Sequence, residues 1–391
     1  MREKRIRISG YGSISALGHK REAIFETYRS GEVKYTESAG VPVIPLPRES
    51  SEILEALKAE NKLFRGIDRT VLMAIYAARY AMADAGWINE KNISINIGSS
   101  RGATTLFEEY ISRFNSSGTV PPNTSPVTTL GNISSFVGQD LNSTGCSLSH
   151  SVTCSTGLQA IANAVAWLKA GMAEKFLAGA SEAPLTPFTI AQMKALGIYS
   201  NEITGPYPCQ PFNVNRKNTF VLGEGAAIFA LEQVEDKQVE GPGFYIESVG
   251  LGFESIGSKT SVSKEGKNFQ RAMENAIKNA EIDSPVDMVI LHAPGTVVGD
   301  YAELNALKQV FGHSGMPFIS SSKWLTGHTL GASGCMALDY ALYILETQHV
   351  LDFPYLTSIP ACVNKRPVKR IMVTAAGFGG NAAALIVTRS S

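Results

Sequence analysis

Apolar and polar positions alternate along the chain in a way that predicts strands and helices following one another. Short apolar runs between Gly, Asn or Asp predict buried strands, whereas apolar residues spaced three or four apart predict helices. Strands are expected at 5–9, 92–97, 176–180, 226–231, 244–249, 288–292, 370–375 and 383–387. Helices are expected at 68–86, 154–169, 268–280, 300–311 and 334–346. This alternation favours α/β layers.

Polar segments separate these elements. The stretch 112–129 is rich in Ser, Thr, Pro, Asn and Gly, which predicts a long loop or lid. At 235–243 the composition turns polar and rich in Gly and Pro. We place a boundary there, between an N-terminal half at 1–235 and a C-terminal half at 236–391. No repeat between the halves is legible in the sequence.

Composition and charge exclude several classes of protein. The 391 residues carry 35 Lys and Arg against 35 Asp and Glu, so the net charge is zero and a general nucleic-acid binder is not expected. The 44% share of hydrophobic residues predicts a folded protein with a large core. The longest apolar runs are too short to span a bilayer, and no signal peptide is visible, which predicts a cytoplasmic protein. The five cysteines show no CxxC spacing, which argues against a disulfide framework or a structural zinc site.

Cys154 is the first candidate for chemistry. It lies in SVTCSTG, where a predicted strand gives way to a helix. The free N–H groups and the positive dipole end of a helix lower the pKa of a thiol, and the same N–H groups can hold an oxyanion. Taken alone, the residue could equally be a small buried core cysteine. We expect Cys154 to be the cysteine that iodoacetamide labels fastest near neutral pH.

Two histidines lie in Gly-rich segments, His292 in HAPGTVVGDYAE and His328 in KWLTGHTLGASG. A thiol with two imidazoles suggests a nucleophile supported by charge stabilisation or proton transfer. An ion pair between Lys323 and Glu303 could orient the histidines. A Cys/His/His metal site is the alternative, but no two of its ligands are closely spaced. The turn GFGGN at 377–381 could supply a second oxyanion donor or could be a structural hairpin turn.

Six segments in order resemble the elongating β-ketoacyl-acyl carrier protein synthases, the decarboxylating condensing enzymes of the thiolase fold. RISGYGSISALG resembles the opening strand and turn of the family, and TCSTGLQAI resembles its nucleophile motif. PFNVNRKNTFVLGEGAAIFALE resembles its PFD…GFVLGEGA segment, and HxxGTxxxDxxE, KxxxxH and GFGGN follow. The resemblance implies two similar α/β halves in a five-layered α-β-α-β-α core, usually in a dimer.

The resemblance also implies roles for residues. Cys154 would accept the acyl chain, and His292 and His328 would assist malonyl decarboxylation with support from Lys323 and Glu303. The backbone N–H groups of Cys154 and Phe378 would form the oxyanion hole, and Phe378 would gate the acyl pocket. The remaining substrate contacts would be Thr296 to the phosphopantetheine arm, Met193, Gly377 and Gly379 in the same chain, and Phe107 from the neighbouring chain of a dimer.

The implied partners are acyl carrier protein and its acyl- and malonyl-thioesters, with no metal or organic cofactor. The assembly would be a homodimer or a heterodimer with a chain-length factor. Acidic carrier proteins would dock on basic side chains, for which Lys62, Arg65 and Arg69 are candidates. The pathway would be fatty-acid, polyketide or polyene biosynthesis.

The chain departs from the family pattern in one motif. The family usually has HGTGT, whereas this chain has HAPGT, so Pro294 replaces a threonine that meets the pantetheine. HAPGT and the short length look more like the branch that makes aryl polyenes or flexirubin-type pigments. Two alternatives remain: a Cys-His-Asn condensing enzyme, which has Asn where this chain has His328, and a non-catalytic chain-length factor, which lacks the cysteine. Acyl chain length is not fixed by the sequence.

Overall fold

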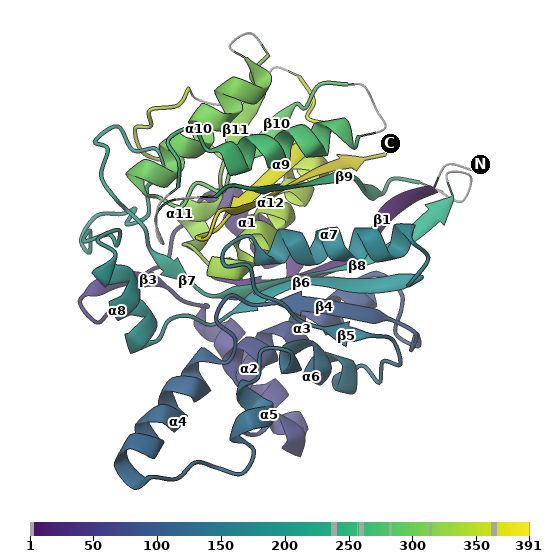
Figure 1. Cartoon of the computed structure of the whole chain (residues 1–391), viewed down its shortest axis with the longest axis vertical. Helices are drawn as coiled ribbons and strands as arrows, with labels where there is room; N and C mark the ends of the chain where they lie inside the picture. Colours follow the sequence, from purple (N-terminus) through teal and green to yellow (C-terminus); the bar gives the residue numbers. More distant parts are fainter. Residues whose placement is uncertain are drawn as a thin grey trace.

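Ten strands form one twisted sheet that runs through the whole molecule (Figure 1). The computed structural model describes residues 4–235, 241–255, 257, 262–280, 284–312, 315–360 and 366–390. The strand order is β11-β10-β12-β13-β9-β1-β8-β6-β4-β5. In chain order, the first five strands of this sheet are β1 (Lys4–Ser15), β4 (Ser94–Gly98), β5 (Ser147–Leu148), β6 (Lys175–Glu182) and β8 (Gly225–Glu235). The other five are β9 (Phe244–Phe253), β10 (Met288–Ile290), β11 (Phe318–Ser320), β12 (Arg370–Ala376) and β13 (Asn381–Arg389).

The two halves of this sheet have the same topology. In each half the first strand pairs antiparallel with the last, as β1 does with β8 and β9 with β13. In the N-terminal half, β8 also pairs antiparallel with β6, β6 pairs parallel with β4, and β4 pairs parallel with β5. In the C-terminal half, β13 also pairs antiparallel with β12, β12 pairs parallel with β10, and β10 pairs parallel with β11. The halves join where residues 6–8 of β1 pair with 244–246 of β9. The expectation of two similar halves is therefore confirmed, although the sequence shows no repeat.

Helices complete five layers. Between the two sheet halves lie α7 (Thr156–Lys169) and α12 (Ser333–Thr347), each touching strands of both halves. Outside the N-terminal half lies α3 (Arg69–Asp84), and outside the C-terminal half lie α9 (Lys267–Lys278) and α10 (Val297–Phe311) (Figure 1). Because α12 lies at the centre, its residues from Ser333 to Leu345 are all buried. The predicted α-β-α-β-α core is confirmed.

Most predicted elements are present. The helix expected at 68–86 is α3, and the Asp68 side chain caps it by accepting the N–H of Thr70. The strand expected at 5–9 continues to Ser15 through Gly10 and Gly12, where a turn was expected. A Cβ on Gly10 or Gly12 would lie 2.5 or 2.4 Å, respectively, from a backbone oxygen of α3, so these glycines allow the helix to pack closely on the strand.

The prediction of a loop or lid at 112–129 is wrong. Two helices occupy most of this region, α4 (Thr104–Ser117) and α5 (Thr124–Thr128). Leu106 and Tyr110 bury one face of α4, and Gly118 ends the helix with φ 69. The polar composition concealed a helix that is anchored on one side only. In Figure 1, α4 and α5 project from the main body.

Further helices were not predicted, namely α1 (Arg21–Ser30), α2 (Arg48–Glu60), α6 (Asn132–Asp140), α8 (Pro187–Ala195) and α11 (Lys323–Thr326). A short second sheet contains β2 (Thr36–Ser38), β3 (Val41–Ile44) and β7 (Leu222–Gly223). Over the described ranges, no helix combines the length and the apolar character needed to cross a membrane. The predicted boundary adjoins 236–240, which lie outside the described residues, so its place stays a prediction.

Candidate active site

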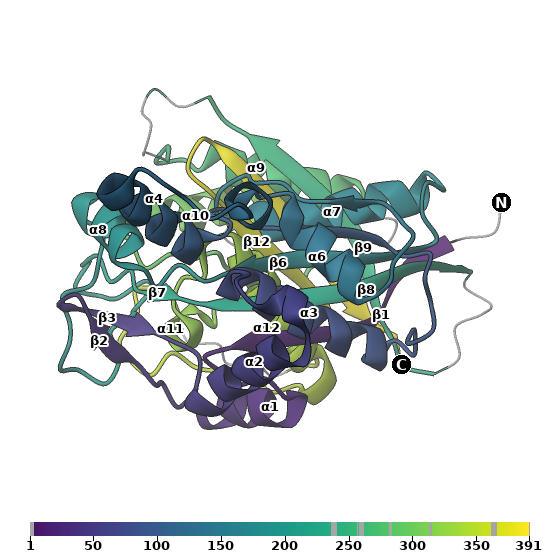
Figure 2. The same ribbon diagram turned by 90° about the horizontal axis from the view of Figure 1, so that it is seen from below.

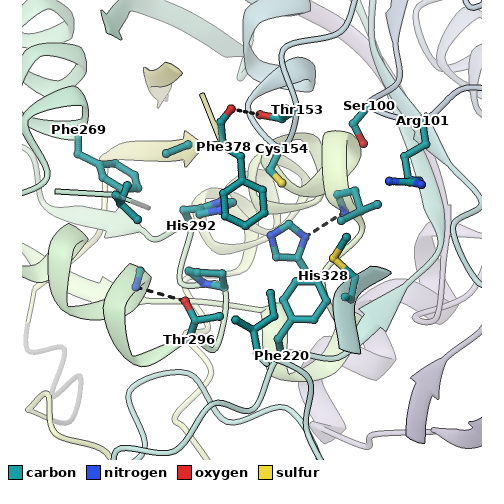
Figure 3. Close-up of a pocket in the computed structure, with 18 residues that line it drawn as sticks. Ser100, Arg101, Thr153, Cys154, Phe220, Phe269, His292, Thr296, His328 and Phe378 are labelled. Atoms are coloured by element: carbon teal, nitrogen blue, oxygen red, sulfur yellow. Dashed lines mark hydrogen bonds between the residues drawn. The ribbon is translucent and has the colours of Figure 1, made fainter. Parts of the chain in front are cut away.

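A cavity of about 160 Å³ lies between the two halves of the molecule (Figure 3). It brings together Cys154, His292 and His328, three residues that the sequence singled out separately. Four other predicted site residues line it as well, namely Met193, Thr296, Gly377 and Phe378. The other lining residues are Ser100, Arg101, Thr153, Ile198, Phe220, Val262, Phe269, Pro294, Gly299, Leu330 and Ala376. Gly379, Lys323 and Glu303 are not among the lining residues.

Cys154 lies on a strained turn just before α7. The preceding residue, Thr153, has φ 54, a value that a β-branched residue rarely adopts. Its hydroxyl donates a hydrogen bond to the Phe378 carbonyl at 3.0 Å, which ties the turn to the glycine-rich segment (Figure 3). A Cβ on Gly377 would lie 1.8 Å from Thr153 Oγ1 and 2.7 Å from the Cys154 nitrogen. Only glycine fits at position 377 without displacing the Cys154 turn.

Two backbone donors face this turn. Within the described ranges, neither the Cys154 N–H nor the Phe378 N–H has a hydrogen-bond acceptor. Buried backbone donors are normally paired, so two unpaired ones at a cavity are available to an oxygen that binds there. Phe378 is 36% exposed, and its ring lies next to Cys154 and His292 in the view of Figure 3.

The expected lowering of the Cys154 pKa is wrong. Burial raises the pKa of this thiol to about 12, and the positive charges of Lys323 and Arg101 offset only part of that effect. The helix starts at Thr156, two residues beyond the thiol, so burial outweighs the helix terminus. Cys146 is the exposed thiol among the four described cysteines, so we now expect it to react first with iodoacetamide. Cys362 lies outside the described residues.

The two imidazole rings face each other nearly at right angles. Their centroids are 5.2 Å apart and their planes make an angle of 86°. His328 Nδ1 accepts the N–H of Leu330 at 3.0 Å, so the ring hydrogen of neutral His328 resides on Nε2. Burial, followed by the charge of Lys323, holds the pKa of both rings well below the usual value. Both histidines are therefore neutral near pH 7 and act as hydrogen-bond donors or acceptors rather than as charges.

Glu303 supports the His292 loop through the backbone and not through an ion pair. Its carboxylate accepts the N–H groups of His292 at 2.9 Å and Ala293 at 2.8 Å, and the Thr374 hydroxyl at 2.5 Å. The predicted ion pair is wrong: throughout the described part of the chain, no carboxylate oxygen lies within 4.0 Å of Lys323 Nζ. Burial lowers the pKa of Lys323 to about 8, although nearby Cys209 and Cys154 act in the opposite direction.

The HAPGT motif forms the cavity wall next to His292. Ala293 is buried and has φ 36, a left-handed value. Pro294 lines the cavity and contributes no hydrogen-bond donor there. Thr296 caps α10, because its Oγ1 accepts the N–H of Gly299 at 3.2 Å. This hydroxyl lies at the cavity and remains able to donate a hydrogen bond.

Several residues at the site were missed by the sequence reasoning. Arg101 and Ser100 line the cavity, and their only signal was the segment GSSRG directly after a predicted strand. Glu182 is fully buried behind Ser100 and accepts the N–H groups of Ser100 and Gly331. Burial raises the pKa of this carboxyl to about 7. A single acid at the end of a buried strand carried no pattern that could reveal it.

Two other predicted contacts lie away from the cavity. Phe107 is 53% exposed on α4 and is not part of the cavity wall. Arg69 cannot serve as a free docking residue, because its guanidinium makes two hydrogen bonds to Glu224, at 2.8 and 3.0 Å. Lys62 and Arg65 are exposed and stay candidates. In the ranges that the structure covers, no three His, Cys, Asp or Glu residues are grouped as a metal site would require.

Comparisons with known proteins agree with this arrangement. The family description "Beta-ketoacyl synthase, N-terminal domain" matches residues 55–237, and "Beta-ketoacyl synthase, C-terminal domain" matches 245–354. The chain is 31% identical over 406 residues to 3-oxoacyl-[acyl-carrier-protein] synthase 2 of Staphylococcus aureus strain COL, with 98% of each covered. It is 27% identical over 414 residues to synthase 1 of Haemophilus influenzae, with 99% of each covered.

Solved structures show the same fold. A β-ketoacyl synthase from Burkholderia phymatum superposes with a TM-score of 0.83 at 24% identity, covering all of both chains. A ketosynthase solved with its chain length factor, from Xenorhabdus doucetiae, gives 0.80 at 22% identity, covering 99% of this chain and 98% of that one. The matches to both family domains span well over half of the sequence. The chain therefore belongs to the β-ketoacyl synthase family, the condensing enzymes of fatty-acid and polyketide synthesis.

Proposed function

We propose that this protein is a β-ketoacyl-acyl carrier protein synthase in which Cys154 accepts an acyl group and condenses it with a malonyl thioester. The observation that carries this proposal is the cavity that brings together Cys154, His292 and His328, with two unpaired backbone N–H groups beside the thiol. Membership of the family supports the reaction class. The roles of individual residues are inferred from geometry and chemistry.

In the first step the acyl group moves to Cys154. The Cys154 sulfur attacks the thioester carbonyl, a new carbon–sulfur bond forms, and the bond to the pantetheine sulfur breaks. Because burial keeps the thiol protonated, its proton must leave during the attack and finally protonates the pantetheine thiolate. The neutral imidazoles at the same cavity are able to carry this proton. The N–H groups of Cys154 and Phe378 would stabilise the tetrahedral oxyanion.

In the second step the malonyl thioester loses carbon dioxide. The bond to the carboxyl carbon breaks, and its electron pair forms an enolate. Neutral His328, with its hydrogen on Nε2, is suited to donate a hydrogen bond to the enolate oxygen, and His292 provides a second imidazole. The enolate carbon then attacks the acyl-Cys154 carbonyl, and the cysteine sulfur leaves. The products are a β-ketoacyl thioester, carbon dioxide and free Cys154.

The substrates in this proposal arrive on the phosphopantetheine arm of an acyl carrier protein, and neither a metal nor an organic cofactor takes part. Thr296 lines the cavity and would donate a hydrogen bond to the arm, whereas Pro294 has no donor for it. Two related structures include such partners: one is a type II polyketide ketosynthase with its acyl-carrier protein, and another is a ketosynthase with its chain length factor. Binding of a carrier protein by this chain is inferred from the shared chemistry.

We further propose that the exposed apolar face of α4 is covered by a second subunit. Phe107, Ile111 and Phe114 are each about half exposed and follow one another at helical spacing. Phe188 on α8 lies beside them, because Glu108 accepts its N–H at 3.4 Å (Figure 2). The second subunit is either another copy of this chain or a chain-length factor. In a homodimer Phe107 would reach the partner's acyl pocket, so Phe107→Ala should lengthen the longest acyl chain accepted.

The experiment measures acyl loading and decarboxylation separately. The protein is incubated with a panel of acyl-carrier thioesters, and the mass of the adduct on Cys154 is measured; labelled malonyl-carrier is then added and carbon dioxide is counted. Cys154→Ala should form no adduct. His292→Ala and His328→Ala should each still form it, because the other imidazole remains to carry the thiol proton, but each should release little carbon dioxide. An adduct of undiminished yield in Cys154→Ala, or normal carbon dioxide release by both histidine variants, would contradict the mechanism.

The pathway is inferred more coarsely. HAPGT and the short chain resemble the branch that makes aryl polyenes, and the panel should therefore include unsaturated and aromatic acyl groups beside saturated ones. Preferential loading of polyunsaturated or aryl acyl groups would support that branch. Preferential loading of saturated chains would assign the protein to fatty-acid synthesis instead.

A further inference from the structure

Arg101 makes the cavity unlike an ordinary hydrocarbon pocket (Figure 3). It lines the cavity together with apolar side chains, among them Met193, Ile198, Phe220 and Leu330. Among the described residues that line the cavity, Arg101 is the sole side chain with a formal charge near pH 7, because both histidines are neutral. A guanidinium placed in apolar surroundings needs partners for its hydrogen bonds.

The partners of Arg101 are incomplete. One terminal nitrogen donates to Gln192 Oε1 on α8. The Nε atom is buried and has no hydrogen-bond partner within the described ranges. No carboxylate oxygen there lies within 4.0 Å of the guanidinium either. The neighbouring acid, Glu182, bonds the backbone behind Ser100 instead and is not part of the cavity wall. The other terminal nitrogen, Nη1, is not buried and has no hydrogen-bond partner in the described part of the chain. Arg101 therefore offers a positive charge and free N–H groups to whatever occupies the cavity.

The position of Arg101 makes the acyl group its natural ligand. Cys154 lines the same cavity as Arg101 (Figure 3). The positive charge of Arg101 acts on the thiol, since it lowers the pKa of Cys154 against the effect of burial. An acyl chain attached to Cys154 would therefore share this cavity with the guanidinium.

We propose that Arg101 selects acyl groups that carry an acceptor oxygen, a carboxylate or a ketone, over plain alkyl chains. This inference rests on the proposed function, because it concerns the acyl group that Cys154 receives. An alkyl chain would displace water from the N–H groups of Nη1 and leave them unpaired, which carries a free-energy cost, whereas an acceptor oxygen would accept a hydrogen bond from them. A carboxylate would also neutralise the charge and form a charge-assisted pair.

The test compares matched six-carbon substrates. Hexanoyl-, 5-oxohexanoyl- and adipyl-pantetheine thioesters avoid any contribution from carrier docking, and loading on Cys154 is followed by mass spectrometry. We expect the wild type to load one or both oxygenated groups with a kcat/KM about 10- to 100-fold above that of hexanoyl, as a hydrogen bond to a charged group supports. Arg101→Met should abolish this ratio, mainly by slowing the oxygenated substrates. Arg113→Met, the same change at an exposed site on α4, should keep the ratio.

The outcomes separate the two proposals. Equal loading of all three substrates by the wild type, or an equal loss for all three in Arg101→Met, would overturn the selection by Arg101 while leaving the acyl-transfer function intact. Loading of none of them, and of no carrier-bound acyl group, would overturn the proposed function and this inference with it. Arg101→Lys keeps the charge but loses the planar set of guanidinium N–H donors, and we expect it to retain the preference for adipyl more than for 5-oxohexanoyl. Circular dichroism melting verifies that each variant is folded.

Discussion

Ala293 has a left-handed backbone conformation, which glycine adopts more readily than other residues. Its φ is 36, and its N–H and that of His292 both donate to Glu303, which holds this loop in place. Left-handed geometry costs a residue with a side chain about 1–2 kcal/mol. A β-branched side chain raises that cost further. The loop after β10 therefore depends on the smallest side chains at this position.

We predict that Ala293→Val destabilises the protein by at least about 1 kcal/mol more than Ala306→Val does. Both alanines are fully buried, so overpacking is common to both variants, but Ala306 lies in the interior of α10 with helical geometry. Ala293→Gly should fold and stay within about 1 kcal/mol of the wild type. The free energies of unfolding are compared in urea, and equal losses in the two valine variants would show that the loop is not strained.

Lys323 is a second residue whose environment opposes its usual state. Its side chain is 6% exposed, and burial lowers its pKa from the ordinary 10.5 to about 8. The folded protein therefore binds fewer protons at this group than the unfolded chain does between pH 8 and 10.5. The contribution of Lys323 to the free energy of unfolding therefore rises as the pH increases from 8 to 10.5. Below pH 8 the lysine is charged in both states, and the full free-energy cost of burying the charge applies.

We predict that Lys323→Met stabilises the fold by about 3 kcal/mol at pH 7. The difference from the wild type should shrink as the pH rises from 8 to 10.5, because the lysine then loses its charge in both states. Chemical denaturation of both proteins at pH 7, 9 and 10.5 gives the three values needed. A difference that stays constant with pH would mean that the charge of Lys323 is not the cause.

At the scale of elements, the turn between β12 and β13 controls the geometry of Cys154. We predict that Gly377→Ala lowers the rate of acyl transfer by about 100-fold, the usual effect of losing one oxyanion donor. The added Cβ would collide with Thr153 Oγ1 and crowd the Cys154 N–H, so the turn and the donor must shift. Gly131→Ala, where a Cβ meets no atom within 4 Å, is the matched control. Unimpaired acylation of the Gly377 variant would show that the turn moves without consequence.

The elements differ in how far the sequence predicts them. Buried strands such as β6 and helices with a periodic apolar face such as α9 follow the expected ranges to within two or three residues. The projecting α4 was missed, because only Leu106 and Tyr110 among its apolar residues face the core and the rest is polar or exposed. Residues in motifs, such as Cys154, were found for the same reason that the strands were: a local pattern marks them.

The missed part of the site has a physical cause as well. Arg101, Glu182 and Phe269 reach the active-site region from three separate elements, and no spacing along the chain shows that they meet. The direction of the Cys154 pKa was also wrong, since the sequence shows a nearby helix start but not the depth of burial. Local chemistry is legible in the sequence, whereas desolvation is a property of the assembled fold.

At the scale of the whole molecule, the projecting α4 predicts the assembly. We expect the protein to form a dimer in solution, and we predict that Ile111→Glu combined with Phe114→Glu yields a monomer, because charges cannot be buried unpaired in an apolar interface. Ser112→Glu on the same helix is the control and should remain dimeric. Sedimentation velocity measures both. A double variant that sediments like the wild type would place the subunit contact elsewhere.

Carrier docking is the second prediction for the whole molecule. Lys62 begins the short helix Lys62–Phe64 that precedes α3, and Arg65 directly follows this helix. Both side chains are exposed, whereas Arg69 is excluded by its pair with Glu224. Lys62→Glu combined with Arg65→Glu should weaken binding of acyl carrier protein, more at low salt than at high salt. Lys278→Glu, at the end of α9 in the opposite outer layer, should have no effect. An affinity loss that does not depend on salt would argue against an electrostatic contact.

The single sheet shared by both halves means that the enzyme cannot be divided into a working and a supporting piece. If the polypeptide were cut after Glu235, the N-terminal fragment would keep the nucleophile and the C-terminal fragment would keep both imidazoles. Each fragment would expose the unpaired edge of β1 or β9 and one side of α7 or α12, surfaces that favour reassociation or aggregation. Two separately produced fragments could therefore be mixed in a complementation assay. Catalytic turnover would appear only when β1 and β9 pair again and restore the cavity.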